Sequence, residues 1–172
     1  LVGVYHFACP IENVDHFCFQ ADDPVAEANH FLAVARQYVG HGFLRPVLDI
    51  EEGENLGTAA LSEWVSRWAQ TVEQATGVAP MIYANGNYAQ LLNPSLTQYQ
   101  LWVARYGTNN CDLEQTRTNF PPITGPWGTW TFWQYCSTGS VTGISGNVDL
   151  DVYYGTLDQL QGEVIVLEPG QP

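Results

Sequence analysis

The sequence contains no lysine, and its basic side chains are limited to five arginines and four histidines. Eighteen aspartates and glutamates oppose the arginines, so the formal net charge at pH 7 is −13. Phosphate groups are bound by clustered lysine and arginine, and anionic membrane surfaces attract the same residues. The composition therefore argues against nucleic acid and against a membrane surface as partners, and favours a neutral substrate.

Long apolar runs and phosphate-binding loops are also missing. No apolar stretch approaches the roughly 18 residues that a membrane-spanning helix requires. The opening stretch LVGVYHFACP has neither the basic start nor the sustained apolar run of a signal peptide, and it is typical of a strand inside a domain. No G-x-G-x-x-G follows a strand, so nothing indicates nucleotide binding.

Metal-binding patterns are absent as well. The sequence has no C-x-x-C pair, and the four histidines show no H-x-x-x-H spacing. We therefore expect neither a metal nor a cofactor. Four cysteines allow two disulfides in three connectivities, and proximity in the sequence favours Cys9–Cys18 and Cys111–Cys136. Two disulfides suit a secreted, extracellular protein.

The sequence does contain six short apolar segments, each typical of a strand. With 172 residues, 45% of them hydrophobic, the chain can form one domain with a substantial core. The predicted strands cover residues 2–8, 45–51, 79–85, 99–106, 129–135 and 147–153. Several are almost continuously apolar, as expected for strands of a parallel sheet that is covered on both faces.

Helical periodicity appears between the early strands. Residues 22–39 and 59–76 place apolar side chains at helical spacing, and a shorter helix is expected around residues 88–92. Beyond the fourth strand, residues 107–128 and 136–146 are rich in Asn, Thr, Ser, Pro and Gly, which predicts loops. Alternating strands and helices indicate an α/β fold, either a barrel or a doubly wound sheet.

The second predicted strand ends in a group of acids. Asp49 and Glu51 are two residues apart, so both side chains lie on one face of the strand. Two neighbouring carboxylates in a partly buried site cannot easily both ionise, so one pKa should rise. Glu51, nearer the strand end, is the better placed proton donor, and Asp49 could orient a group or stabilise positive charge. The D-x-E spacing alone is weak evidence, because strands that end in acids usually end at solvent. Glu52 and Glu54, beyond the strand, are expected to be solvated.

The other strand ends carry side chains that suit a sugar site. In a barrel, function resides where the strands end, and sugars are bound by aromatic rings and carboxylates. The candidates at these ends are Tyr5, His6, Tyr83, Tyr106, Trp133, Gln134 and Asp149. For several of these residues the alternative is a structural role without function. A histidine among aromatic residues is commonly a core residue, and Asp149 with Asp151 could be a solvated strand end.

Five stretches together resemble the lysozymes of glycoside hydrolase family 25. They are GVYHFA (3–8), PVLDIE (46–51), TGVAPMIYAN (76–85), LWVARY (101–106) and WTFWQYCSTGSVTGISGNVDLDVYYG (130–155). They occur in the family's order and extend from the first residue to about Gly155. The W-Q-Y stretch, followed by the glycine-rich segment and V-D, is the most specific of these matches.

The resemblance implies an N-acetylmuramidase, which hydrolyses the β-1,4 bond between N-acetylmuramic acid and N-acetylglucosamine in peptidoglycan. It implies an irregular TIM-like (β/α)5β3 barrel, of which six of eight strands are visible here. Glu51 would be the general acid, Asp49 would act on the substrate's 2-acetamido group, and Asp149 would be a further site aspartate. The residues expected to line the glycan cleft are Tyr5, Tyr83, Tyr106 and Gln134.

One departure from the family pattern is large. Family members begin with a D-V-S-x-x-Q-G strand and a second strand, and neither is present before Leu1. We therefore expect residues 1–160 to form an incomplete barrel with exposed strand edges and weak or no activity. Residues 161–172 are expected to form a tail or linker. The expected partner is peptidoglycan, bound by a monomer. The alternatives are a non-catalytic glycan-binding domain and a hydrolase of another β-linked acetamido sugar such as chitin.

Overall fold

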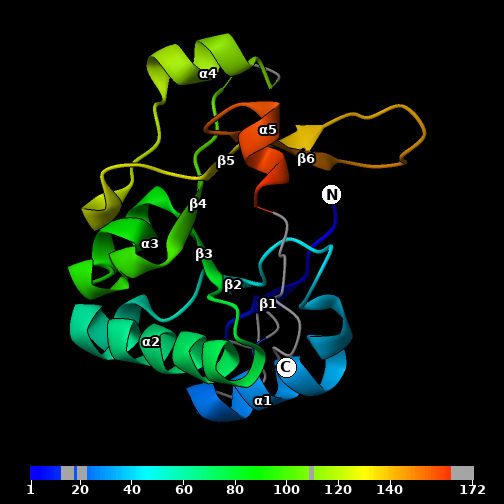
Figure 1. Cartoon of the computed structure of the whole chain (residues 1–172). Coiled ribbons are helices and arrows are strands. Elements are labelled where there is room, and N and C mark those ends of the chain that lie inside the picture. Colours follow the sequence, from blue (N-terminus) through cyan, green and yellow to red (C-terminus); the bar gives the residue numbers. More distant parts are fainter. Residues whose placement is uncertain (13–17, 19–22, 109–110, 164–172) are drawn as a thin grey trace.

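A computed structural model describes residues 1–12, 18, 23–108 and 111–163, and these form an α/β fold around one curled six-stranded sheet (Figure 1). The strands follow chain order across the sheet, and the first five are parallel whereas the sixth is antiparallel to the fifth. They are β1 (Tyr5–Phe7), β2 (Val47–Ile50), β3 (Met81–Asn85), β4 (Gln100–Ala104), β5 (Phe132–Gly139) and β6 (Val148–Tyr153). All six strands predicted from the sequence are confirmed.

Five α-helices and four short 3-10 turns lie between or after the described strands. The helices are α1 (Pro24–Ala35), α2 (Gly57–Thr76), α3 (Gly86–Leu91), α4 (Leu113–Asn119) and α5 (Leu157–Gln161). The 3-10 turns are η2 (Arg36–Tyr38), η3 (Glu54–Leu56), η4 (Pro94–Gln98) and η5 (Gly125–Trp127). Helices α1 and α2 lie together against the outer face of β1, β2 and β3 (Figure 1). None of the helices among the described residues is long and apolar enough to cross a membrane.

The loop prediction for residues 107–128 was wrong in part, because α4 and η5 form there. Helix α4 has the sequence LEQTRTN, which lacks an apolar stripe that periodicity could detect. It begins at a side-chain cap, where Asp112 accepts a hydrogen bond from the backbone of Gln115, and only Thr116 is buried.

The loop prediction for residues 136–146 was also wrong in part. Strand β5 continues to Gly139, because β6 supplies an antiparallel partner for residues whose composition is typical of a turn. The pairing is irregular, with register shifts on either side of Cys136. Both expected disulfides, Cys9–Cys18 and Cys111–Cys136, are present.

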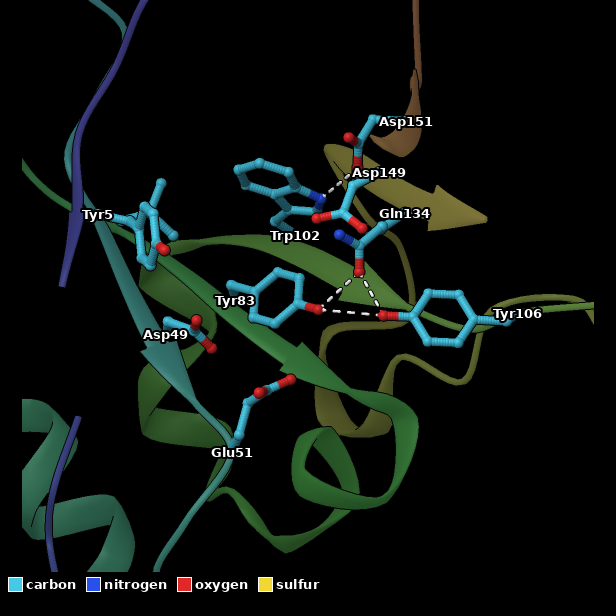
Figure 2. Close-up of a pocket in the computed structure, with 10 residues that line it drawn as sticks. Tyr5, Asp49, Glu51, Tyr83, Trp102, Tyr106, Gln134, Asp149 and Asp151 are labelled. Atoms are coloured by element: carbon cyan, nitrogen blue, oxygen red, sulfur yellow. Dashed lines mark hydrogen bonds between the residues drawn. The ribbon is translucent and has the colours of Figure 1, made fainter. Parts of the chain in front are cut away.

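Strand alternation separates two faces of the sheet. On β2, Val47, Asp49 and the following Glu51 face the concave inner side (Figure 2), whereas Leu48 and Ile50 face the helices and are fully buried. Only the inner face is therefore available for a site. The acids after β2 differ from expectation, since Glu52 is 3% exposed where the chain turns at Gly53 with φ 101°. Glu54 is exposed and accepts a hydrogen bond from the Tyr88 hydroxyl.

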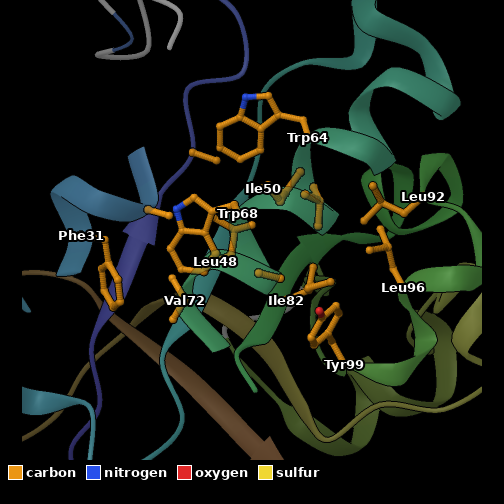
Figure 3. Packing of buried hydrophobic residues seen from close by; sticks show 14 of the residues in the cluster. Phe31, Leu48, Ile50, Trp64, Trp68, Val72, Ile82, Leu92, Leu96 and Tyr99 are labelled. Atoms are coloured by element: carbon orange, nitrogen blue, oxygen red, sulfur yellow. The ribbon is translucent and has the colours of Figure 1, made fainter. Parts of the chain in front are cut away.

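The main core lies between the outer face of the sheet and helices α1 and α2 (Figure 3). Trp68 on α2 is fully buried at its centre and contacts the rings of Phe31 and His6, with centroid distances of 5.3 and 5.6 Å. Leu48 and Ile82 pack on it from the sheet. This core fixes β2 and β3 and hence the direction in which their inner side chains point.

The inner face is less completely covered. Among the described residues β1 pairs only with β2, and Tyr5 on β1 is 68% exposed. In the described part of the chain the curled sheet thus ends at β1, and the full (β/α)5β3 barrel stays a prediction. The expected tail lies almost wholly outside the described residues, although Glu163 still bonds to Gln100 and Tyr153.

Candidate active site

A pocket of about 340 Å³ occupies the inner face of the sheet (Figure 2). Its walls come from all six strands and from residues just beyond the ends of β2 and β4. They are Tyr5, Val47, Asp49, Glu51, Tyr83, Trp102, Tyr106, Gln134, Asp149 and Asp151. Four carboxyl groups and four aromatic rings thus meet in one hollow.

Strand register explains why these side chains meet. Asp49 pairs with Tyr83, and Tyr83 pairs with Trp102, so the three side chains form one row across β2, β3 and β4. Glu51 lies one step beyond Asp49 on the same face, towards the ends of the strands. From the antiparallel side, Asp151 pairs with Gln134, which closes the pocket opposite the β2 acids.

The Asp49 carboxyl group has an unusual environment. Burial, followed by the negative charge of Glu51, raises its pKa from 3.8 to about 7. Its Oδ1 atom is buried and has no hydrogen-bond partner among the described residues. The sequence predicted that one pKa of the pair would rise, and the structure shows this rise on the deeper Asp49. A carboxyl group in this state is suited to receive a donor from a ligand.

Tyr83, Tyr106 and Gln134 form a hydrogen-bonded group on the wall facing the two acids. Both tyrosine hydroxyls donate to Gln134 Oε1, at 2.7 Å from Tyr83 and 2.5 Å from Tyr106. Burial raises the pKa of Tyr83, and the hydroxyl of Tyr106 adds to this, so Tyr83 stays protonated. Gln134 is 6% exposed, and its amide nitrogen points away from the two tyrosines (Figure 2).

Trp102 was not among the residues predicted from the sequence. Its indole Nε1 donates to Asp151 Oδ1 at 2.8 Å, and its ring meets that of Tyr83 edge to face, with centroids 5.6 Å apart. Partial burial raises the pKa of Asp151, and the bond from Trp102 opposes that rise. Asp151 keeps an exposed surface at the pocket rim, so this shift has little energetic weight. The alternation of β4 could have revealed Trp102, because it shares a face with Gln100 and Ala104.

Seven of the candidate residues are brought together in the pocket. They are Tyr5, Asp49, Glu51, Tyr83, Tyr106, Gln134 and Asp149. The two remaining candidates, His6 and Trp133, do not line it. Each is next in the chain to a residue that does, Tyr5 and Gln134 respectively, and adjacent residues of a strand face opposite sides.

His6 and Trp133 have structural contacts on the outer face. His6 Nε2 lies 2.8 Å from Glu27 Oε2 of α1, and the His6 ring stacks on Trp68. Trp133 is 1% exposed, and its indole Nε1 donates to the Arg105 carbonyl at 2.9 Å. Both residues therefore belong to the packing behind the pocket. In the described part of the chain, no group of three or more His, Cys, Asp or Glu is arranged to hold a metal.

Comparison with known proteins places this fold and pocket in a family. The family model of glycosyl hydrolases family 25 matches residues 1–144, and the chain belongs to that family. The chain is 32% identical over 165 residues to the protein YegX of Escherichia coli O6:H1, covering 95% of this chain and 52% of YegX. It is 27% identical to Lysozyme M1 of Streptomyces globisporus, covering 92% of this chain and 51% of that protein. The chain thus spans about half the length of these relatives.

Solved structures show the same arrangement of strands and helices. The spore cortex lytic enzyme SleM of Clostridium perfringens matches with a TM-score of 0.70 at 28% identity, over 91% of this chain and 50% of SleM. A bacterial lysozyme from Streptomyces coelicolor matches with a TM-score of 0.69 at 25% identity, over 94% of this chain and 71% of that chain. The curled sheet is therefore the part of a family 25 fold that this chain contains.

Proposed function

We propose that the protein is a peptidoglycan hydrolase of the N-acetylmuramidase type. It would cleave the β-1,4 bond between N-acetylmuramic acid and N-acetylglucosamine. The observation that carries the proposal is the Asp49–Glu51 pair, which faces a pocket of aromatic and amide side chains and contains one carboxyl group with a pKa raised to about 7. Paired carboxyl groups of differing acidity are what glycosidic cleavage requires.

Glu51 is the general acid in this proposal. It lies beyond Asp49 towards the strand ends, where a glycosidic oxygen entering the pocket would meet it first. Protonation of that oxygen lets the sugar leave as an alcohol, while positive charge develops on the anomeric carbon. Asp149 on the opposite wall supplies a negative charge facing that carbon.

Asp49 acts on the 2-acetamido group of the sugar. In the free protein the carboxyl group of Asp49, whose pKa is raised to about 7, holds a proton below that pH. An acetamido N–H that donates to the unpartnered Asp49 Oδ1 stabilises the ionised form of Asp49. The proton then becomes available to Glu51, and the oriented acetamido oxygen approaches the anomeric carbon. Substrate binding would in this way prepare the acid.

The raised pKa of Asp49 in the protein without substrate predicts a pH dependence of hydrolysis. Because the pair loses its proton as the pH rises through about 7, kcat/KM should fall on the alkaline side of that value. Asp49→Asn should move this limb to lower pH, because no neighbouring carboxylate then favours the protonated form of Glu51, and should reduce kcat/KM by about 10²-fold. Rates of peptidoglycan cleavage between acidic and mildly alkaline pH measure both effects, with Asp158→Asn on the exposed face of α5 as the matched control.

Stability provides a second measurement on the same variants. The folded pKa of Asp49 lies above its unfolded value of 3.8, so protonation favours the folded form below 3.8, and this contribution is lost as the pH rises through about 7. The asparagine variant should therefore gain stability relative to the parent protein between these two values, as seen in urea midpoints. An unchanged difference across this range would contradict the raised pKa.

Product analysis tests the proposed reaction directly. Incubation with purified peptidoglycan should release fragments whose new reducing end is N-acetylmuramic acid, identified by borohydride reduction and mass spectrometry. New reducing ends on N-acetylglucosamine would instead place the cut at the other bond. Cleavage of chitin oligomers in preference to peptidoglycan would favour the chitinase alternative, and binding without any cleavage would favour the glycan-binding alternative.

The setting proposed for this activity is outside the cell, where the protein acts as a monomer on the wall. Two disulfides support an oxidising compartment. The net charge of −13 limits adsorption to anionic wall polymers.

A further inference from the structure

A second pocket adjoins the first, and no step of the proposed reaction uses it. Its volume is about 260 Å³, smaller than the first pocket and of a size suited to one sugar unit. It lies between the segment that follows β4 and the outer half of β5. The side chains that matter for its chemistry are Tyr106, Thr108, Tyr135, Ser137 and Thr138.

Tyr106 joins the two pockets, since it lines both. Its hydroxyl donates to Gln134 in the first pocket, which holds the ring in place, and the residue remains 43% exposed. The two pockets therefore neighbour each other at this ring, as two successive binding positions for one chain of sugars would. Such continuity is expected where a polymer, and not a single sugar, is bound.

The chemistry of the second pocket differs from that of the first. Four carboxyl groups line the first pocket, whereas none of the described residues lining the second carries a charge. The second pocket is lined by three hydroxyl-bearing residues, Thr108, Ser137 and Thr138, together with two tyrosines. Rings that cover the CH face of a sugar and hydroxyls that bond to its oxygens suit an uncharged pyranose. Charged stem-peptide groups would find no counter-charge there.

The Cys111–Cys136 disulfide forms part of the wall of this pocket. It ties the segment before α4 to β5, and Cys111 has φ 62°, a backbone conformation that residues other than glycine rarely adopt. The backbone N–H of Thr138 donates to Cys136 Sγ at 3.2 Å, which fixes the hydroxyl-bearing residue relative to the disulfide. The wall is thus prepared before a ligand arrives.

We propose that this second pocket is a binding subsite for a neutral sugar unit of the glycan strand, one position along from the sugars at the Asp49–Glu51 pair. The inference rests on the proposed function for its choice of polymer. It adds that recognition extends along the strand on the β4–β5 side and is directed at the glycan, not at the stem peptide.

The test uses peptide-free glycan strands of two, four and six sugars and measures their affinity by calorimetry in a Glu51→Gln background. Affinity should rise with strand length. Ser137→Trp, which fills the pocket, should reduce the gain from two to six sugars about fivefold, as expected when one or two net hydrogen bonds are lost. Thr138→Val removes one hydroxyl without filling the pocket and should reduce the gain about twofold. Thr142→Trp, on the exposed β5–β6 connection, is the control and should keep the full gain.

Each outcome of this test decides a separate claim. If affinity still rises fully with strand length in both pocket variants, the subsite is overturned, whether or not the parent protein hydrolyses peptidoglycan. A gain that the pocket variants lose, in a parent protein without hydrolysis, supports the subsite and rejects the proposed reaction. A Cys111→Ser/Cys136→Ser variant that retains its fold by circular dichroism should show the same reduced gain, and an undiminished gain would contradict the role given to the disulfide.

Discussion

Glu51→Gln should lower kcat for peptidoglycan cleavage by about 10²- to 10⁴-fold, the contribution typical of a positioned general acid. Glutamine keeps the shape of the side chain but has no proton to give to the glycosidic oxygen. Because Glu51 lies at the pocket wall and not in the core, the fold should be unaffected. Turbidity loss of cell-wall suspensions gives the rate, and calorimetry with glycan strands should show that binding is retained.

The matched control for this change is Glu63→Gln, which makes the same chemical substitution on the exposed face of α2. It should leave the rate unchanged. If Glu51→Gln retained more than about a tenth of the parent rate, the proton would come from another group, and the assignment of Glu51 would be withdrawn. Equal losses in both variants would point to surface charge instead of acid catalysis.

Trp68→Ala should lower the free energy of unfolding by about 3–5 kcal/mol, the range for removal of a large aromatic side chain from a core. Trp68 is fully buried, and it contacts α1 through Phe31 and β1 through His6. The cavity would open between the helices and the sheet that carries the active pair. Urea denaturation at fixed pH measures the change.

Trp68→Phe provides the informative comparison. The indole Nε1 of Trp68 is buried and has no hydrogen-bond partner among the described residues, so tryptophan loses solvation there without compensation. Phenylalanine removes that N–H while keeping one aromatic ring against His6 and Phe31. Its cost should therefore be below about half of the alanine cost. Equal costs for both variants would show that ring volume, and not the mere presence of a ring, determines stability at this position.

The six strands and the active pair could be predicted because their signals are local. Apolar runs bounded by turn residues mark the strands, and the spacing of Asp49 and Glu51 determines that both face one side. The same alternation of side chains along a strand could have shown that Tyr5 and His6 face opposite sides of the sheet, as do Gln134 and Trp133. Where a strand is regular, adjacent side chains face opposite sides, so of these two pairs only Tyr5 and Gln134 line the pocket of the active pair.

Other features depended on contacts between distant residues. Trp102 enters the site through strand register and its bond to Asp151, 49 residues away in the chain. Which acid of the pair has the raised pKa depends on how deeply each lies below the pocket mouth, and spacing alone does not determine depth. Helix α4 depends on one cap and one buried threonine, which are too few residues to produce a periodic pattern.

The hydrogen bonds of Tyr83 and Tyr106 limit what a ligand can offer to that wall. Each hydroxyl has a single proton, and both protons are committed to Gln134 Oε1. The two tyrosines can therefore only accept from a bound molecule, as can an ionised Asp49. A ligand must bring O–H or N–H groups to these two hydroxyls, because an ether or carbonyl oxygen placed against them would meet only lone pairs. The pocket thus selects the orientation of a sugar by its hydroxyl protons as well as by its shape.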